Sequence, residues 1–67
     1  MTVKFSFILK NGRDVVVTTE DKEENINEVL NVISTAFLNN LESVAKIDST
    51  LVRISDCSVA EWEIINE

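Results

Sequence analysis

The longest periodic pattern of the chain lies between residues 22 and 40, where apolar positions recur at spacings of three and four. This spacing places the apolar side chains on one face of a helix. The positions are Ile26, Val29, Leu30, Ile33, Ala36 and Phe37. A helix with one apolar face has to bury that face against another element, so the rest of the chain is expected to cover it.

The ends of this helix carry residues with known capping preferences. At the start, Asp21 and Glu24 have the spacing of a capping box, in which each side chain accepts a hydrogen bond from the backbone of the other residue. At the end, Asn39 and Asn40 tolerate the left-handed conformation that commonly terminates helices. We therefore predict one helix from Lys22 to Asn40.

The first nineteen residues show the period-two alternation of a half-buried strand, followed by a turn and a β-branched run. One face of the first strand carries Val3, Phe5, Phe7 and Leu9, and the other carries Lys4, Ser6, Ile8 and Lys10. The dipeptide Asn11-Gly12 favours a tight turn, and the run from Val15 to Thr19 suits a second strand. The pattern predicts a hairpin over residues 2 to 19.

The register of this hairpin depends on the length of its loop. A two-residue turn would set Lys10 opposite Arg13 and would place Asp14 on the apolar face, and both arrangements are unfavourable. A three-residue loop that ends with Gly12 in the left-handed conformation avoids both conflicts. The pairs that follow are Leu9 with Arg13, Phe7 with Val15 and Phe5 with Val17. We predict this second register.

Three stretches after the helix have strand character. They are residues 43 to 48, which form a weak strand, residues 51 to 54, and residues 60 to 65. Val52 and Ile54 share one face of the second stretch, and Trp62 and Ile64 share one face of the third. The sequence Asp56-Cys57-Ser58 is expected to interrupt the strand conformation between the last two strands.

This order of elements predicts an α+β fold. It is ββα followed by two or three strands, forming one mainly antiparallel sheet with a single helix packed on one face. The predicted core consists of Phe5, Phe7, Ile26, Leu30, Ile33, Phe37, Val52 and Ile54, with Val15 and Val17 also beneath the helix. At 67 residues the chain forms a single domain, residues 1 to 67, close to the smallest size that one core can hold together.

The composition indicates in which cellular environment the protein is expected. Hydrophobic residues make up 45% of the chain, which is too many for a disordered protein, and the apolar runs are too short to cross a membrane. We expect no membrane partner. The chain shows no secretory signal, and a lone Cys57 cannot form an internal disulfide, so we expect a cytoplasmic location.

Charge argues against a nucleic acid as partner. The chain has twelve acidic and six basic residues, and the resulting net charge of −6 opposes binding to a phosphate backbone. The charge is uneven, because residues 1 to 19 sum to +2 whereas residues 20 to 28 and residues 29 to 67 sum to −4 each. This asymmetry fits ordinary solvation of a small surface, and it also fits steering of a partner.

The residue types that usually carry catalysis are sparse. Histidine is absent, so the commonest general base and metal ligand is missing, and Cys57 has no imidazole partner. The acidic cluster between Glu20 and Glu28 lacks the alternating ligands and the glycine of a calcium loop. The only glycine is needed for the hairpin, so no phosphate-binding loop is present. We predict no catalytic residues, no cofactor, no metal site and no small-molecule substrate.

Several apolar residues fall outside the predicted core. They are Ile8 and Val16 on the polar face of the hairpin, Val32 and Leu38 on either side of the apolar stripe of the helix, and Trp62 in the last strand. Isolated surface hydrophobes are normal in small proteins, and Trp62 is equally suited to the core. The same residues also suit a subunit interface, because a small chain gains core by association. We take these five as candidate interface residues.

The layout resembles small uncharacterised accessory proteins of phages and mobile elements of Gram-positive bacteria. The resemblance is carried by the hairpin from Phe5 to Arg13, the acidic start of the helix, the strand Leu51-Val52-Arg53-Ile54 and the stretch from Val59 to Ile64. It implies an accessory role, either as a virion or tail-module component or as a binder of a host protein. The location would then be the host cytoplasm or the virion.

Two functions remain open at this point. The first is a non-enzymatic protein–protein interaction or assembly module whose partner is itself, as a dimer or larger oligomer, or another protein. The alternative is an acidic inhibitor that mimics the charge of a nucleic acid on a host protein. Salt separates the two hypotheses, because charge mimicry weakens steeply as salt rises and an apolar interface does not.

Overall fold

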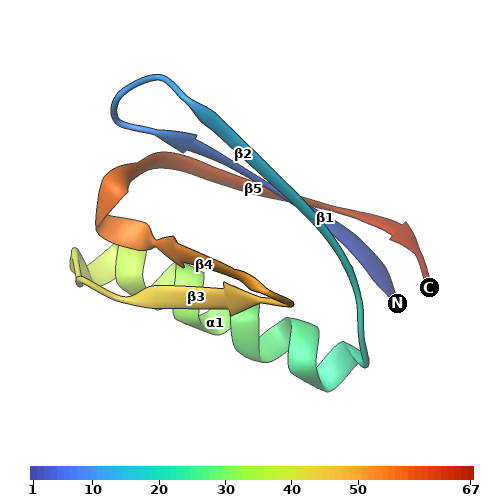
Figure 1. Cartoon of the computed structure of the whole chain (residues 1–67). Coiled ribbons are helices and arrows are strands. Elements are labelled where there is room, and N and C mark those ends of the chain that lie inside the picture. Colours follow the sequence, from blue (N-terminus) through green and yellow to red (C-terminus); the bar gives the residue numbers. More distant parts are fainter.

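The computed structural model describes all 67 residues and contains two antiparallel sheets and one α-helix (Figure 1). In chain order the elements are β1 (Thr2–Leu9), β2 (Asp14–Glu20), α1 (Glu23–Asn39), β3 (Val44–Ile47), β4 (Thr50–Arg53), the 3-10 helix η1 (Ile54–Asp56) and β5 (Cys57–Asn66). The main sheet has the order β2-β1-β5, and β3 pairs with β4 in a second sheet. The predicted α+β class is confirmed.

The register of the first hairpin agrees with the prediction. Phe5 lies opposite Val17 and Phe7 opposite Val15. The loop is closed by two backbone hydrogen bonds, in which the Leu9 N–H donates to the Arg13 carbonyl at 2.8 Å and the Gly12 N–H donates to the Leu9 carbonyl at 2.9 Å. Gly12 has φ +89°, a conformation that only glycine adopts without strain. The chemistry of the turn therefore fixes which residues of β1 and β2 face the core.

The last strand, β5, pairs with the central strand β1 and forms one edge of the main sheet. Phe5 lies opposite Trp62, Phe7 opposite Ala60 and Val3 opposite Ile64. Because residues directly opposite each other share a face, these three residues of β5 lie on the same side of the sheet as the core. The strand is longer than the predicted residues 60 to 65 and begins at Cys57, where the sequence had indicated a break.

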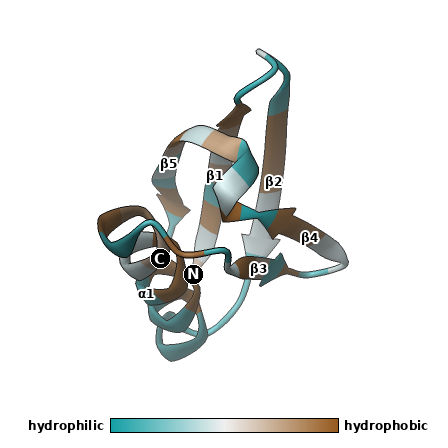
Figure 2. Ribbon diagram, turned by 90° about the vertical axis from the view of Figure 1, so that its left-hand side faces the viewer, coloured by the Kyte–Doolittle hydropathy of each residue, from teal (hydrophilic) through white to brown (hydrophobic).

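The β3–β4 hairpin forms a sheet of its own instead of extending the main one. Its turn is held by the Thr19 hydroxyl, which donates to an Asp48 carboxylate oxygen at 2.8 Å, and the 3-10 helix η1 that follows it is held by the Lys10 N–H, which donates to the Asp56 carbonyl at 2.8 Å. Both views place α1 and this hairpin side by side under the same face of the main sheet (Figures 1 and 2). The second layer therefore consists of α1 and the β3–β4 hairpin.

The core lies between the two layers. Its buried hydrophobic members are Val3, Phe5, Phe7, Ile26, Ile33, Ala36, Ala45, Ile47, Val52, Ile54 and Cys57. The rings of Phe5 and Phe7 are nearly parallel, with centroids 6.4 Å apart. These residues come from β1, α1, β3, β4, η1 and the first residue of β5.

The prediction of Phe37 as a core residue was wrong, and Leu30 is only half-buried. Phe37 is 39% exposed, whereas its neighbour Ala36 is 2% exposed. The β3 strand and η1 contact one flank of α1, and this contact turns the buried stripe of the helix toward Ala36. Val15 and Val17 face the inner side of the sheet as expected, but both are half-buried, and Val15 lies at a cavity lined by the β3–β4 hairpin and not by the helix.

The start of the helix also differs from the prediction. The helix begins at Glu23, and its N-cap is Lys22, whose side chain makes no capping hydrogen bond. Asp21 does not form a capping box with Glu24, because one oxygen of its carboxylate accepts hydrogen bonds from the Lys22 N–H and from the Asn25 side chain, each at 2.8 Å. The end of the helix agrees, with Asn40 in the left-handed conformation at φ 53°.

We expect Lys22→Asp to stabilise the protein by about 0.5–1 kcal/mol, since an aspartate at the N-cap accepts a backbone hydrogen bond and favours the positive end of the helix dipole. Urea denaturation followed by circular dichroism measures the change. The matched control is Lys46→Asp on β3, which makes the same charge change away from a helix end. Equal effects of the two substitutions would show that net charge, and not capping, is responsible.

No helix of the structure combines the length and the apolar character that crossing a bilayer requires.

Candidate interaction surfaces

All five candidate interface residues are exposed, but they do not form one surface. Ile8 and Val16 lie on the outer face of the main sheet, and Leu38 and Trp62 line a groove between α1 and β5. Val32 is 40% exposed and, by helical periodicity, lies on the other flank of α1 from Leu38. The structure therefore resolves the predicted set into two surfaces and one isolated residue.

The first surface is the outer face of the main sheet, which no other element covers (Figure 2). Ile8 pairs with Val59 on β5, and Ser6 pairs with Val16 on β2, so Ile8, Val16 and Val59 form a cluster on adjacent strands. We call these three residues the outer-face cluster. Sequence reasoning missed Val59, because the irregular register of β5 between Cys57 and Val59 breaks the alternation that would have placed it.

The second surface is the groove between α1 and β5, which we call the α1–β5 groove. It has a volume of about 420 Å³ and is lined by Ile33, Ser34, Phe37, Leu38, Ser58, Val59, Ala60 and Trp62. Leu38 is 85% exposed and Trp62 is 48% exposed. The groove exists because the β3–β4 hairpin fills the β2 side of the second layer and leaves the β5 side to the helix alone.

The edge of β5 beside this groove carries unpaired backbone groups. Backbone N–H and C=O groups of successive residues in a strand point to opposite sides. The Leu9 N–H is bonded to β2, so the even-numbered residues of β1 bond to β5, and their partners there include Glu61 and Glu63. The backbone groups of Ala60, Trp62 and Ile64 consequently point away from the sheet.

The charges near this edge are negative. Glu61 and Glu63 lie on the outer face, where Glu63 is opposite Lys4 and Glu61 is opposite Ser6. Both carboxylates are exposed. Charged side chains on an edge strand oppose uncontrolled pairing with other strands. On β5 both of these charges are negative.

The acidic cluster at the start of α1 forms a separate feature, at the end of the helix away from the groove. Glu20, Asp21, Glu23, Glu24 and Glu28 are all exposed. The hydrogen bonds from the Asn25 side chain and from the Lys22 N–H lower the pKa of Asp21. Part of this cluster therefore serves the local structure of the helix start.

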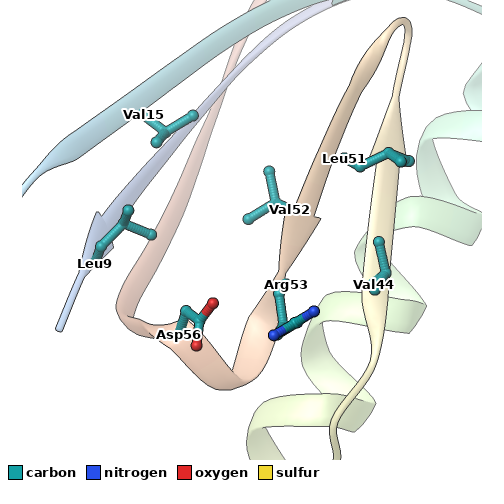
Figure 3. Close-up of a pocket in the computed structure, with 7 residues that line it drawn as sticks. All are labelled: Leu9, Val15, Val44, Leu51, Val52, Arg53 and Asp56. Carbon is teal, nitrogen blue, oxygen red and sulfur yellow. The ribbon is translucent and has the colours of Figure 1, made fainter.

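A further cavity of about 520 Å³ lies between β2 and the β3–β4 hairpin (Figure 3). Leu9 and Val15 lie on the side of the main sheet, and Val44, Leu51 and Val52 come from the second sheet, with Arg53 and Asp56 as the charged members. Sequence reasoning did not predict this cavity, because it depends on how the two sheets are placed relative to each other.

Cys57 is a buried residue at the start of β5. It is 4% exposed, and its thiol donates a hydrogen bond of 3.5 Å to the Arg53 carbonyl. Burial raises the pKa of the thiol, and the nearby Asp56 carboxylate raises it further, against the smaller opposing effect of Lys10. The folded protein therefore holds Cys57 as the neutral thiol, which is a poor nucleophile.

We expect a specific loss of stability at alkaline pH from this thiol. A thiol whose pKa is raised by folding contributes its full stability below the ordinary pKa of 9.0 and loses it as the pH rises toward the folded value. The free energy of unfolding of the wild type should therefore fall relative to that of Cys57→Ala between about pH 8 and pH 10. Urea midpoints over that range measure it, and a difference that is independent of pH would contradict the assignment.

No group of three or more His, Cys, Asp or Glu side chains is arranged to hold a metal ion. No protein-family model, no curated protein and no solved structure matches the chain.

Proposed function

We propose that the protein is a non-enzymatic protein–protein interaction or assembly module that associates with copies of itself. One observation carries this proposal. Twelve large hydrophobic residues are each more than a third exposed, whereas the buried core contains eleven hydrophobic residues. Scattered surface hydrophobes are normal, but a chain that exposes as many as it buries gains substantially from association.

The outer-face cluster supports self-association better than the edge of β5 does. A two-fold axis through the free edge would pair β5 with its own copy. Centring that pair on Trp62 sets Glu61 opposite Glu63, and centring it on either glutamate sets that residue opposite itself. Like charges directly opposite each other destabilise a sheet. Ile8, Val16 and Val59 are themselves uncharged, with Asp14 and Glu61 beside them on the same face, so a two-fold contact lets the apolar side chains meet their copies.

Charge mimicry is the competing hypothesis, and it draws on the exposed carboxylates at the start of α1. Such binding would weaken steeply with salt, since it depends on charges separated by solvent. Association through apolar side chains is largely insensitive to salt. An accessory or structural role of the kind that the sequence resemblance implies would use the apolar surface.

A dilution series followed by NMR tests the proposed interface. The amide resonances of Ile8, Val16 and Val59 should move as the sample is diluted from about millimolar to about micromolar concentration, because association is governed by mass action. Amides of the β3–β4 hairpin serve as the internal control and should stay in place. Resonances of the outer-face cluster that do not move with concentration would contradict the proposal.

A further inference from the structure

The free edge of β5 and the α1–β5 groove lie next to each other and form one continuous surface, which has only Val59 in common with the outer-face cluster. We propose that this surface binds an extended segment of a partner protein in which basic and apolar residues alternate, and that the segment pairs with β5 as a fourth strand of the main sheet. The inference rests on the proposed role as an interaction module and names a second partner and a second surface for it.

The backbone of β5 has unpaired hydrogen-bonding groups along its free edge. The N–H and C=O groups of Ala60, Trp62 and Ile64 point away from β1 and are available to an incoming strand. Edge strands in other proteins capture extended peptides through unpaired backbone groups of this kind, by adding a strand to the sheet. The ten-residue length of β5 leaves room for pairing on either side of Trp62.

The side chains of β5 define what the incoming strand has to carry. Trp62 faces the inner side of the sheet, so a residue opposite it would extend over the groove beside Phe37 and Leu38, where an apolar side chain is favoured. Residues opposite Glu61 and Glu63 would lie on the outer face, where a basic side chain is favoured. Because successive residues of a strand alternate between faces, the preferred segment alternates between apolar and basic residues.

Charge also decides against a second copy of this chain at the same edge. Pairing of β5 with itself brings Glu61 and Glu63 together in the registers centred on residues 61 to 63. A basic segment reverses that repulsion, and Glu61, whose neighbour on β1 is the neutral Ser6, gains the most from it. The net charge of −6 attracts such a segment from a distance as well.

A synthetic peptide tests the inference directly. The probe is an acetylated and amidated peptide of alternating lysine and valine with threonine at each end. Trp62 is the only tryptophan of the chain, so its emission reports occupation of the groove. We expect a saturable blue shift with this peptide and none with a matched peptide that carries glutamate in place of lysine.

Hydrogen exchange distinguishes strand addition from loose adsorption. The amides of Ala60, Trp62 and Ile64 should exchange at least about tenfold more slowly with the peptide bound, because they become hydrogen-bonded. The amides of Glu61 and Glu63, which already bond to β1, should change little. A blue shift without protection of the three edge amides would overturn the inference.

Two charge variants separate a local effect from net charge. The double substitution Glu61→Gln and Glu63→Gln should weaken peptide binding by about 3- to 10-fold at low salt. The control, Glu23→Gln with Glu28→Gln, removes the same charge at the start of α1 and should leave the Kd within about twofold. Equal weakening by both pairs would contradict recognition at β5.

A backbone variant tests the pairing itself. Ile64→Pro removes an N–H that points to the free edge, so the ladder with β1 stays intact, and proline is tolerated at such positions. The variant should stay folded by circular dichroism and lose peptide binding. A folded variant that binds like the wild type would overturn the inference. Loss of peptide binding in a protein that still dimerises leaves the proposed self-association standing, so the two proposals fail separately.

Discussion

Replacing Phe5 by alanine is expected to unfold most of the protein at room temperature. Phe5 is 1% exposed, stacks with Phe7 and lies at the centre of the main sheet, with Val17 on one side and Trp62 on the other. Removing a buried phenylalanine costs about 3–5 kcal/mol, and a core of this size supplies about 3–5 kcal/mol in total. The loss should be visible as the collapse of the urea transition monitored by circular dichroism.

Phe37→Ala is the matched control for that substitution. It removes the same atoms from a side chain that is 39% exposed at the α1–β5 groove, so the expected cost is about 1–2 kcal/mol. Ile33→Ala, at a buried position on the same helix, should fall between the two, at about 2–4 kcal/mol. If Phe37→Ala were as damaging as Phe5→Ala, the placement of the helix under the sheet would be wrong.

Val16→Glu is expected to weaken the proposed self-association by at least about 30-fold, because it places a charge within the apolar cluster that would form the two-fold contact. Val16 is 57% exposed, so the monomer should fold with little loss of stability. Sedimentation over a range of concentrations measures the dissociation constant.

Leu51→Glu provides the control for this second prediction. Leu51 is 68% exposed on β4, outside the outer-face cluster, and the substitution makes the same change in charge and side-chain type. It should leave the dissociation constant within about twofold. Equal weakening by the two variants would mean that added negative charge, and not the loss of the apolar contact, separates the subunits.

The parts of the fold that were predictable are those that local chemistry decides. A two-residue turn would set Lys10 opposite Arg13 and Asp14 on the apolar face, which favoured the three-residue loop. Gly12 adopts the left-handed conformation that this loop needs, and Phe7 pairs with Val15 as predicted. The period of the apolar residues indicated the helix, and Asn40 marked its end. Even the weak strand in residues 43 to 48 is present, as β3.

The remaining features depend on how distant segments are placed. The alternation of apolar residues after the helix does not show whether these strands join the main sheet or form a separate sheet. In the structure β3 and β4 pair with each other as a hairpin, so neither needs a partner in the main sheet. That choice covers Ala36, leaves Phe37 at the groove and opens the cavity beside Val15. Local patterns identified the exposed hydrophobes Ile8, Val16, Val32, Leu38 and Trp62, but their division into separate surfaces follows only from the arrangement of the layers.

We propose that the exposed apolar surface serves association between copies of the chain. Light scattering coupled to gel filtration, on the wild-type protein at about 100 micromolar and again after dilution, tests it most directly. Self-association predicts a mass near twice the 7.5 kDa of the chain at the higher concentration, falling toward 7.5 kDa as the sample is diluted. A single species of 7.5 kDa at every concentration would contradict it.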